Sequence, residues 1–175
     1  MENQQQPARK KIMLNYGLLS GLILIVISLL TYATGNTYTP HWSINVISIV
    51  SMIVIIVLGI KKFKDLNGSF LSLGQSLKTG IGIALLSVIA FMIYLYVFAN
   101  FIEPEFINRT TEINIQKALE NNPSIPQETL DMQESMTKKY FFLFTFGFFL
   151  IFNLFIGFIT SLIAGIVMKK VENEY

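Results

Sequence analysis

The sequence predicts an all-α integral membrane protein, a bundle of four membrane-spanning helices that forms a single membrane domain over residues 1–175. Three observations predict this fold class. Only 14% of the 175 residues are charged, whereas about 25% are charged in a typical soluble domain. The mean hydropathy is +0.56. The apolar residues are concentrated in long uncharged stretches flanked by lysine and arginine, which is typical of membrane spans.

Each span is predicted from an uncharged stretch that is long enough to cross a bilayer, which takes about 20 apolar residues. The stretch between Lys11 and Lys61 has room for two spans, and the polar segment 34–41 has the composition of a turn between them. The first span exceeds the core of a signal peptide, about 7–15 residues, so we expect it to be retained. The fourth is longer than a bilayer requires, so we expect it to tilt or protrude. The expected spans are residues 12–33, 43–60, 79–102 and 140–168.

The distribution of basic residues predicts the orientation, because lysine and arginine near span ends favour the cytoplasmic side. With a cytoplasmic N-terminus, the segments on that side carry nine of the 13 basic residues. The outer loop, residues 103–139, then carries four basic and seven acidic residues, a net charge of −3. Most tyrosines, which prefer the membrane interface, fall near the outer span ends. We therefore expect a multi-pass membrane protein with cytoplasmic N- and C-termini.

The outer loop 103–139 is expected to be helical. The two acids and the proline at 103–105 are typical of a helix start, and this helix is expected to reach about Leu119. The polar, proline-containing segment 121–126 then breaks it. A second helix is expected to begin at Gln127 and to continue without interruption into the fourth span. The loop has too few apolar residues for its own core, so we expect it to lie on the membrane surface or to pack on the outer helix ends.

The cytoplasmic loop 61–78 is short, yet apolar residues recur in it, and Asn67-Gly68 is a turn signal. Two interpretations stay open. The loop is either a connector that lies against the membrane or a docking surface for a partner or gate. The residues of the possible docking surface are Phe63, Asp65, Leu66, Asn67, Gly68 and Phe70.

Small residues recur at four-residue steps in the first and fourth spans. Such residues share one helix face and let helix backbones approach closely in lipid. Bulky aromatic residues crowd the outer halves of the third and fourth spans, so we expect a bundle that is tight near the cytoplasm and wider outside. The alternative is a crevice open to the outside. For the mid-span amide of Asn153 we expect a structural hydrogen bond, with a solute contact as the alternative. The predicted helix-packing seam consists of Gly17, Gly21, Asn153, Gly157, Ser161 and Gly165.

The composition excludes several function classes. Without cysteine the chain has no disulfide, thiolate metal site or cysteine nucleophile. No acidic or basic residue lies within the core of a span, where ion-coupled transporters usually place one. The single histidine, His41, is expected to be an interface residue beside Trp42. The net charge of +2 is too small to indicate a nucleic-acid partner. We expect no enzyme activity, catalytic residue, cofactor or bound metal ion.

Three segments carry a resemblance to a known family. They are residues 16–21 (YGLLSG), residues 61–80 (KKFKDLNGSFLSLGQSLKTG), which are the most specific, and residues 101–106 (FIEPEF). The chain resembles, over nearly its whole length, the small bacterial membrane proteins grouped as domain of unknown function 4199. The resemblance implies a four-helix integral protein of the bacterial inner (cell) membrane and implies no activity.

These observations favour a non-catalytic structural or accessory component of the membrane. We expect it to reside in the lipid bilayer and to assemble, through the small-residue seams, with itself or with a membrane-protein partner. The alternative is a channel or transporter for a neutral or apolar small solute that uses the aromatic outer half.

Overall fold

The computed structural model describes residues 2–170. Over this range the chain forms no β-strand, although Leu71 and Lys170 pair in an isolated antiparallel bridge. One helix ends in a short π-helical segment, η1. In chain order the elements are α1 (Glu2–Ala33), α2 (Trp42–Leu66), α3 (Leu73–Val97), η1 (Phe98–Ile102), α4 (Phe106–Asn121) and α5 (Gln127–Met168).

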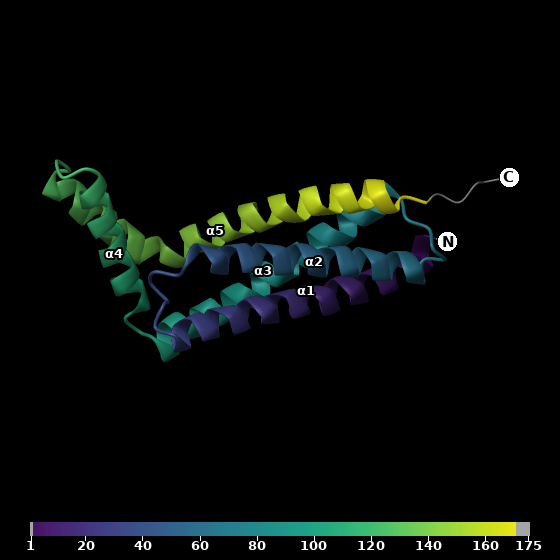
Figure 1. The fold of residues 1–175 in the computed structure, drawn as a ribbon, viewed down its shortest axis with the longest axis horizontal. Helices are drawn as coiled ribbons and strands as arrows, with labels where there is room; N and C mark the ends of the chain where they lie inside the picture. Colours follow the sequence, from purple (N-terminus) through teal and green to yellow (C-terminus); the bar gives the residue numbers. More distant parts are fainter. Residues whose placement is uncertain (1, 171–175) are drawn as a thin grey trace.

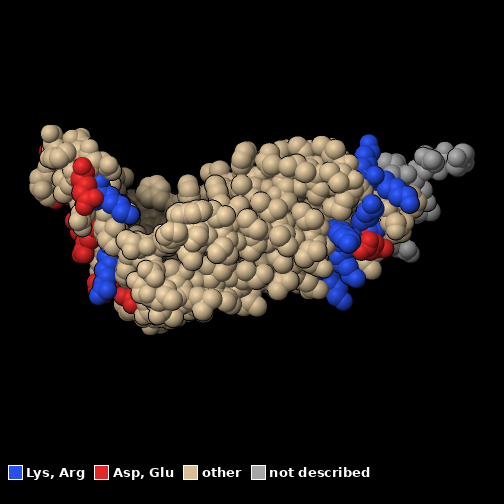
Figure 2. Space-filling model, in the orientation of Figure 1, with Lys and Arg blue, Asp and Glu red and all other residues tan. Residues whose placement is uncertain are grey.

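Four of the α-helices form an elongated bundle, and α4 lies across one end of it (Figure 1). The central helix is α3, which packs most extensively against α1 and α5 and also contacts α2. Charged atoms gather at the two ends, with an uncharged band between them (Figure 2). We call the end that carries α4 the arm end, and the end that carries the start of α1 the basic end.

The predicted fold class is confirmed. Within residues 2–170, four helices are long and apolar enough to cross a membrane. An uncharged surface between two charged ends is what a bilayer requires of a protein that crosses it. The four candidate spans are Ala8–Ala33, Trp42–Leu66, Leu73–Ile102 and Gln127–Met168.

The helices run beyond the expected spans at the basic end. Because α2 continues to Leu66 and α3 begins at Leu73, only 67–72 of the loop 61–78 lie outside helices. Hydropathy predicts only the part of a helix that crosses the membrane. The helix itself continues until other groups satisfy the unpaired backbone N–H and C=O groups at its end. Here a capping box between Ser72 and Gln75 starts α3. The turn at the end of α2 has positive φ at Gly68, +65°.

The core of the bundle is apolar and centred on α2 and α3. Ile56, Ile60 and Ile83 are fully buried. Leu71, in the loop between α2 and α3, also belongs to this core. Its backbone N–H donates to the Lys170 carbonyl oxygen at 2.8 Å, and its carbonyl oxygen accepts from the Lys170 N–H at 3.1 Å. This bridge ties the loop between α2 and α3 to the end of α5.

The longest helix, α5, bends where it leaves the bundle. Tyr140 has non-helical angles (φ −112°, ψ 17°), and the part of α5 before it pairs with α4 (Figure 1). Thr111 on α4 and Leu130 on α5 are buried in this pair. We call residues 106–139 the arm. A helix does begin at Gln127 and lead into the fourth span, but the expectation of an uninterrupted helix is wrong, because the non-helical backbone at Tyr140 divides α5 into two parts.

Candidate functional site

The most extensive polar network that joins separate segments lies at the arm end and is centred on Glu103. This residue follows η1 directly, and its backbone N–H donates to the carbonyl oxygen of Phe98 at 2.8 Å. The π-helical turn thus sets the direction in which the Glu103 side chain leaves the end of the third span. Such turns occur frequently at functional sites.

Two tyrosines donate hydrogen bonds to the two carboxylate oxygens of Glu103. The Tyr32 hydroxyl, at the end of α1, donates to Oε2 at 3.1 Å. The Tyr38 hydroxyl, in the loop before α2, donates to Oε1 at 3.1 Å. The Glu103 side chain is only 19% exposed, so these charge-assisted hydrogen bonds form in a largely enclosed place. They are stronger than bonds between neutral groups.

Arg109 completes the network from α4. Its Nη1 lies 4.0 Å from Oε1 of Glu103, and its guanidinium carbon lies 5.9 Å from the centre of the Tyr38 ring. Burial, followed by the hydrogen bond to Glu103, raises the pKa of Tyr38 above its ordinary value of 10.0. Arg109 itself is exposed, and exposed ion pairs contribute only about 0–1 kcal/mol. Arg109 is the side chain through which α4 joins the network.

Aromatic rings support the network from within the bundle. The Phe98 ring forms T-shaped pairs with the rings of Tyr32 and Phe106, with centroid distances of 5.1 and 5.3 Å. Phe106 in turn meets Phe141 of α5 at 5.9 Å. Edge-to-face pairs of this kind contribute about 0.5–1.5 kcal/mol beyond their buried area. The first turn of α4 is thereby held to α1, η1 and α5 at once.

Chemically, the Glu103 network is an anchor. Both carboxylate oxygens accept hydrogen bonds from protein donors, and the nearby guanidinium balances the charge. Among the described residues no group of three or more histidine, cysteine or acidic side chains is placed to hold a metal ion. The network joins the end of the third span to α1, to the loop before α2 and, through Arg109, to α4.

The predicted seam residues of the first span lie against α3. A Cβ atom added at Gly17 would lie 2.6 Å from Cβ of Leu86, and one added at Gly21 would lie 2.7 Å from Cβ of Ala90. Between them, the Ser87 hydroxyl donates to the Ser20 hydroxyl at 3.1 Å. The backbones of α1 and α3 therefore approach closely along this face.

The seam residues of the fourth span lie against the other side of α3. A Cβ at Gly157 would lie 2.7 Å from Cβ of Ala84, and one at Gly165 would lie 2.9 Å from Cβ of Ser76. Across the same contact, the Ser76 hydroxyl donates to the carbonyl oxygen of Ser161 at 2.7 Å. Asn153 is buried, and its Nδ2 donates within its own helix, to the carbonyl oxygen of Phe149 at 2.8 Å.

The possible docking residues of the cytoplasmic loop are divided between core and surface. Phe63 is 1% exposed and belongs to the hydrophobic core, so a partner has no access to its ring. Asn67 and Phe70 are half-buried, joined by a hydrogen bond from Asn67 Nδ2 to the Phe70 carbonyl at 2.9 Å. Asp65, Leu66 and Gly68 remain exposed.

An open groove of about 420 Å³ lies between α3 and α5. Its walls are apolar side chains of the uncharged band. The lining residues are Ile89, Met92, Ile93, Tyr96, Val97 and Phe146.

The residues of the Glu103 network were not predicted as a site. Tyr32 and Tyr38 carried only the signal of interfacial tyrosines, and Glu103 that of a helix start. His41 also lies at this end, and its Nδ1 is 2.9 Å from the hydroxyl oxygen of Ser43. An acid directly after an apolar span, in a chain with two tyrosines near the same membrane interface, is the sequence signal that could have pointed to the network.

The fold and this site define a class of protein, a multi-pass helical membrane protein with a helical arm anchored at one end of its bundle. Residues 15–170 match the family described as "Protein of unknown function (DUF4199)", and the chain belongs to this family. The resemblance found in the sequence is thereby confirmed. Neither the comparison with curated proteins nor that with solved structures gave a match.

Proposed function

We propose that this protein is a non-catalytic accessory component of the bacterial inner membrane, whose arm recruits a partner protein outside the cytoplasm. The arm end then faces outward, and both termini are cytoplasmic. The distribution of basic residues supports this orientation, because lysine and arginine concentrate at the end that carries the start of α1.

The observation that carries the proposal is the anchored arm. A helical pair projects from the bundle, and the Glu103 network fixes its first turn. Acidic side chains are exposed on both helices, and Figure 2 shows red atoms along the side of the arm away from the bundle. The exposed acids of the arm are Glu112, Glu120, Glu128 and Asp131. The arm also carries four basic residues, so its net charge is −1. The exposed acids on its outer side favour a partner with complementary basic groups, since complementary charge increases association rates and specificity.

We expect the partner to bind the arm and not the small-residue seams. Because Gly17, Gly21 and Gly157 already lie against α3 of the same chain, a second protein has no access to them. The seams therefore support the assembly of the bundle itself.

The test is purification of the tagged protein from its native host in mild detergent, followed by mass spectrometry of the intact complex. We expect a stoichiometric second protein. The double variant Glu112→Lys and Glu120→Lys should lose it. The control Asp65→Lys, an equivalent change at the basic end, should retain it. A homo-oligomer or monomer in the wild type, or equal recovery from the arm variant, would contradict the proposal.

The second candidate function is a channel or transporter for a neutral or apolar small solute. The apolar groove between α3 and α5 favours it. Fully buried side chains such as Ile56 and Ile83 fill the centre of the bundle, which favours the accessory role. Solute flux into liposomes that contain only this protein separates the two, because an accessory component alone should produce none.

A further inference from the structure

The arm projects beyond the side of the bundle. α4 crosses the arm end, and the turn between α4 and α5 lies beyond the edge formed by α5 (Figure 1). Figure 2 shows a hollow between the projecting arm and the uncharged side of the bundle. In a membrane, that uncharged side faces lipid. The hollow then lies where the bilayer surface meets the protein.

A continuous apolar stripe follows α5 from the membrane into the arm. Its residues are spaced four apart, so they share one helix face within each of the two helical parts on either side of the bend at Tyr140. Phe144 and Phe148 are exposed within the span, where lipid covers them. Beyond the bend at Tyr140, the stripe continues with Met136 and Met132, which are 46% and 56% exposed.

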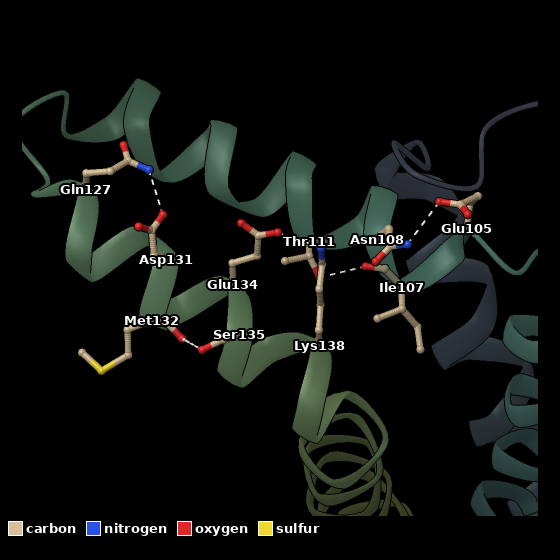
Figure 3. Close-up of polar contacts among 10 residues, drawn as sticks. All are labelled: Glu105, Ile107, Asn108, Thr111, Gln127, Asp131, Met132, Glu134, Ser135 and Lys138. Atoms are coloured by element: carbon tan, nitrogen blue, oxygen red, sulfur yellow. Dashed lines mark hydrogen bonds and ion pairs between the residues drawn. The ribbon is translucent and has the colours of Figure 1, made fainter.

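The two methionines are not part of the contact between α4 and α5. Figure 3 shows Met132 on the side of α5 away from α4, whereas Glu134 and Lys138 point toward α4. Met136 is exposed too, one turn closer to the membrane. An exposed apolar face on a helix that otherwise carries acids and amides indicates that something covers it.

The residues at the bend are typical of the lipid headgroup region. The ammonium group of Lys139 lies 5.1 Å from the centre of the Tyr140 ring. Tyrosine places an apolar ring and a polar hydroxyl at the interface, and lysine places an apolar stem there with its charge in water. This pair lies between the lipid-facing phenylalanines and the two exposed methionines of the same stripe.

From the continuity of this stripe with the lipid-facing surface we propose that the arm rests on the bilayer, with Met132 and Met136 inserted among the headgroups of the adjacent leaflet. The occupant of the hollow is phospholipid. The acidic side chains on the rest of the arm then point away from the membrane. The inference does not depend on the proposed function, because an arm supported by lipid is compatible with either candidate.

The test uses the absence of cysteine from the chain, which lets a single introduced cysteine carry a fluorescent label. The labelled variant Met136→Cys is reconstituted in vesicles of phosphatidylethanolamine and phosphatidylglycerol. We expect a phosphatidylcholine with a nitroxide in its headgroup region to abolish most of the fluorescence, and iodide in the water to have little effect. The variant Met132→Cys, one turn further out, provides an independent second measurement.

The matched control is Glu120→Cys, an exposed position on α4. Its label should respond to iodide and not to the lipid quencher. An arm that stands free in water would make both methionine positions respond to iodide as well, which would overturn the proposal. Protection from both quenchers that grows with the protein-to-lipid ratio would also overturn it, because a second copy of the chain would then cover the stripe.

Discussion

At the scale of single residues, Glu103 shows what can be predicted from the sequence and what cannot. Its position directly after an apolar span is visible in the sequence. Its partners are not, because Tyr32 and Tyr38 lie 71 and 65 positions away along the chain. Only the packing of α1 beside α3 brings them together. The seam glycines can be identified from the sequence because their four-residue spacing is local. The helix that they contact, α3, cannot be identified in this way.

Replacing Glu103 by alanine should loosen the arm and leave the bundle folded. The change removes the acceptor of two tyrosine hydroxyls and the ion-pair partner of Arg109, the side chain through which α4 joins the network. Amide hydrogen exchange over residues 106–139 should therefore accelerate, with little change in α2. Glu112→Ala is the control, since Glu112 is an exposed acid of α4 outside the network. Equal exchange in the two variants would show that the network does not hold the arm.

The raised pKa of Tyr38 predicts a dependence on high pH. A group whose pKa is higher in the folded state stabilises that state fully below its ordinary pKa, 10.0 for tyrosine. The contribution falls as pH rises above that value. In a spectrophotometric titration in detergent, the difference between wild type and Tyr38→Phe should show one tyrosine that ionises above pH 10.0. Ionisation at or below that pH would place Tyr38 in free solvent, away from Glu103.

The glycine seam allows a matched comparison within α5. A side chain at Gly157 would meet Ala84, whereas nothing lies within 4 Å of the Cβ position at Gly147. Overpacking typically costs about 1–3 kcal/mol. Gly157→Leu should therefore lower the thermal unfolding midpoint in detergent, and Gly147→Leu should not. Equal midpoints would show that the α3–α5 contact tolerates a side chain.

At the scale of the elements, hydropathy and helix-terminus signals predicted the helices and most of their limits. The expected outer helix from 103–105 to Leu119 corresponds to α4, Phe106–Asn121. The bend at Tyr140 was not predictable, because no proline or glycine marks it. It coincides with the point at which α5 leaves the bundle and pairs with α4. The bend is thus a property of the tertiary packing.

The arm should open as a unit when its internal contact is weakened. Leu130 is 4% exposed in the contact between α4 and α5, and truncation of a buried leucine costs about 2–5 kcal/mol. Leu130→Ala should therefore accelerate amide exchange throughout residues 106–139 and spare the bundle. The control Gln133→Ala changes an exposed residue of the same helix and should have little effect. Faster exchange in the bundle as well would mean that arm and bundle unfold together.

At the scale of the whole molecule, the charge distribution predicts one orientation in the membrane. The basic end carries nine of the 13 lysine and arginine residues, and the arm end is acidic. Insertion favours the arrangement that keeps lysine and arginine in the cytoplasm. Since the chain has no cysteine, single variants at Asp65 and at Glu120 report on the two ends without other changes. Both positions are exposed.

In intact cells whose outer membrane has been made permeable, a maleimide that does not cross the inner membrane should label Glu120→Cys and not Asp65→Cys. After the inner membrane is disrupted, both should react, which shows that the Asp65→Cys thiol is accessible and that the inner membrane had protected it. The opposite pattern would place the lysine-rich end outside and the arm in the cytoplasm. The partner would then have to be sought in the cytoplasm, while the contact between the arm and lipid would be unaffected, because it depends on the stripe of α5 and not on the side of the membrane.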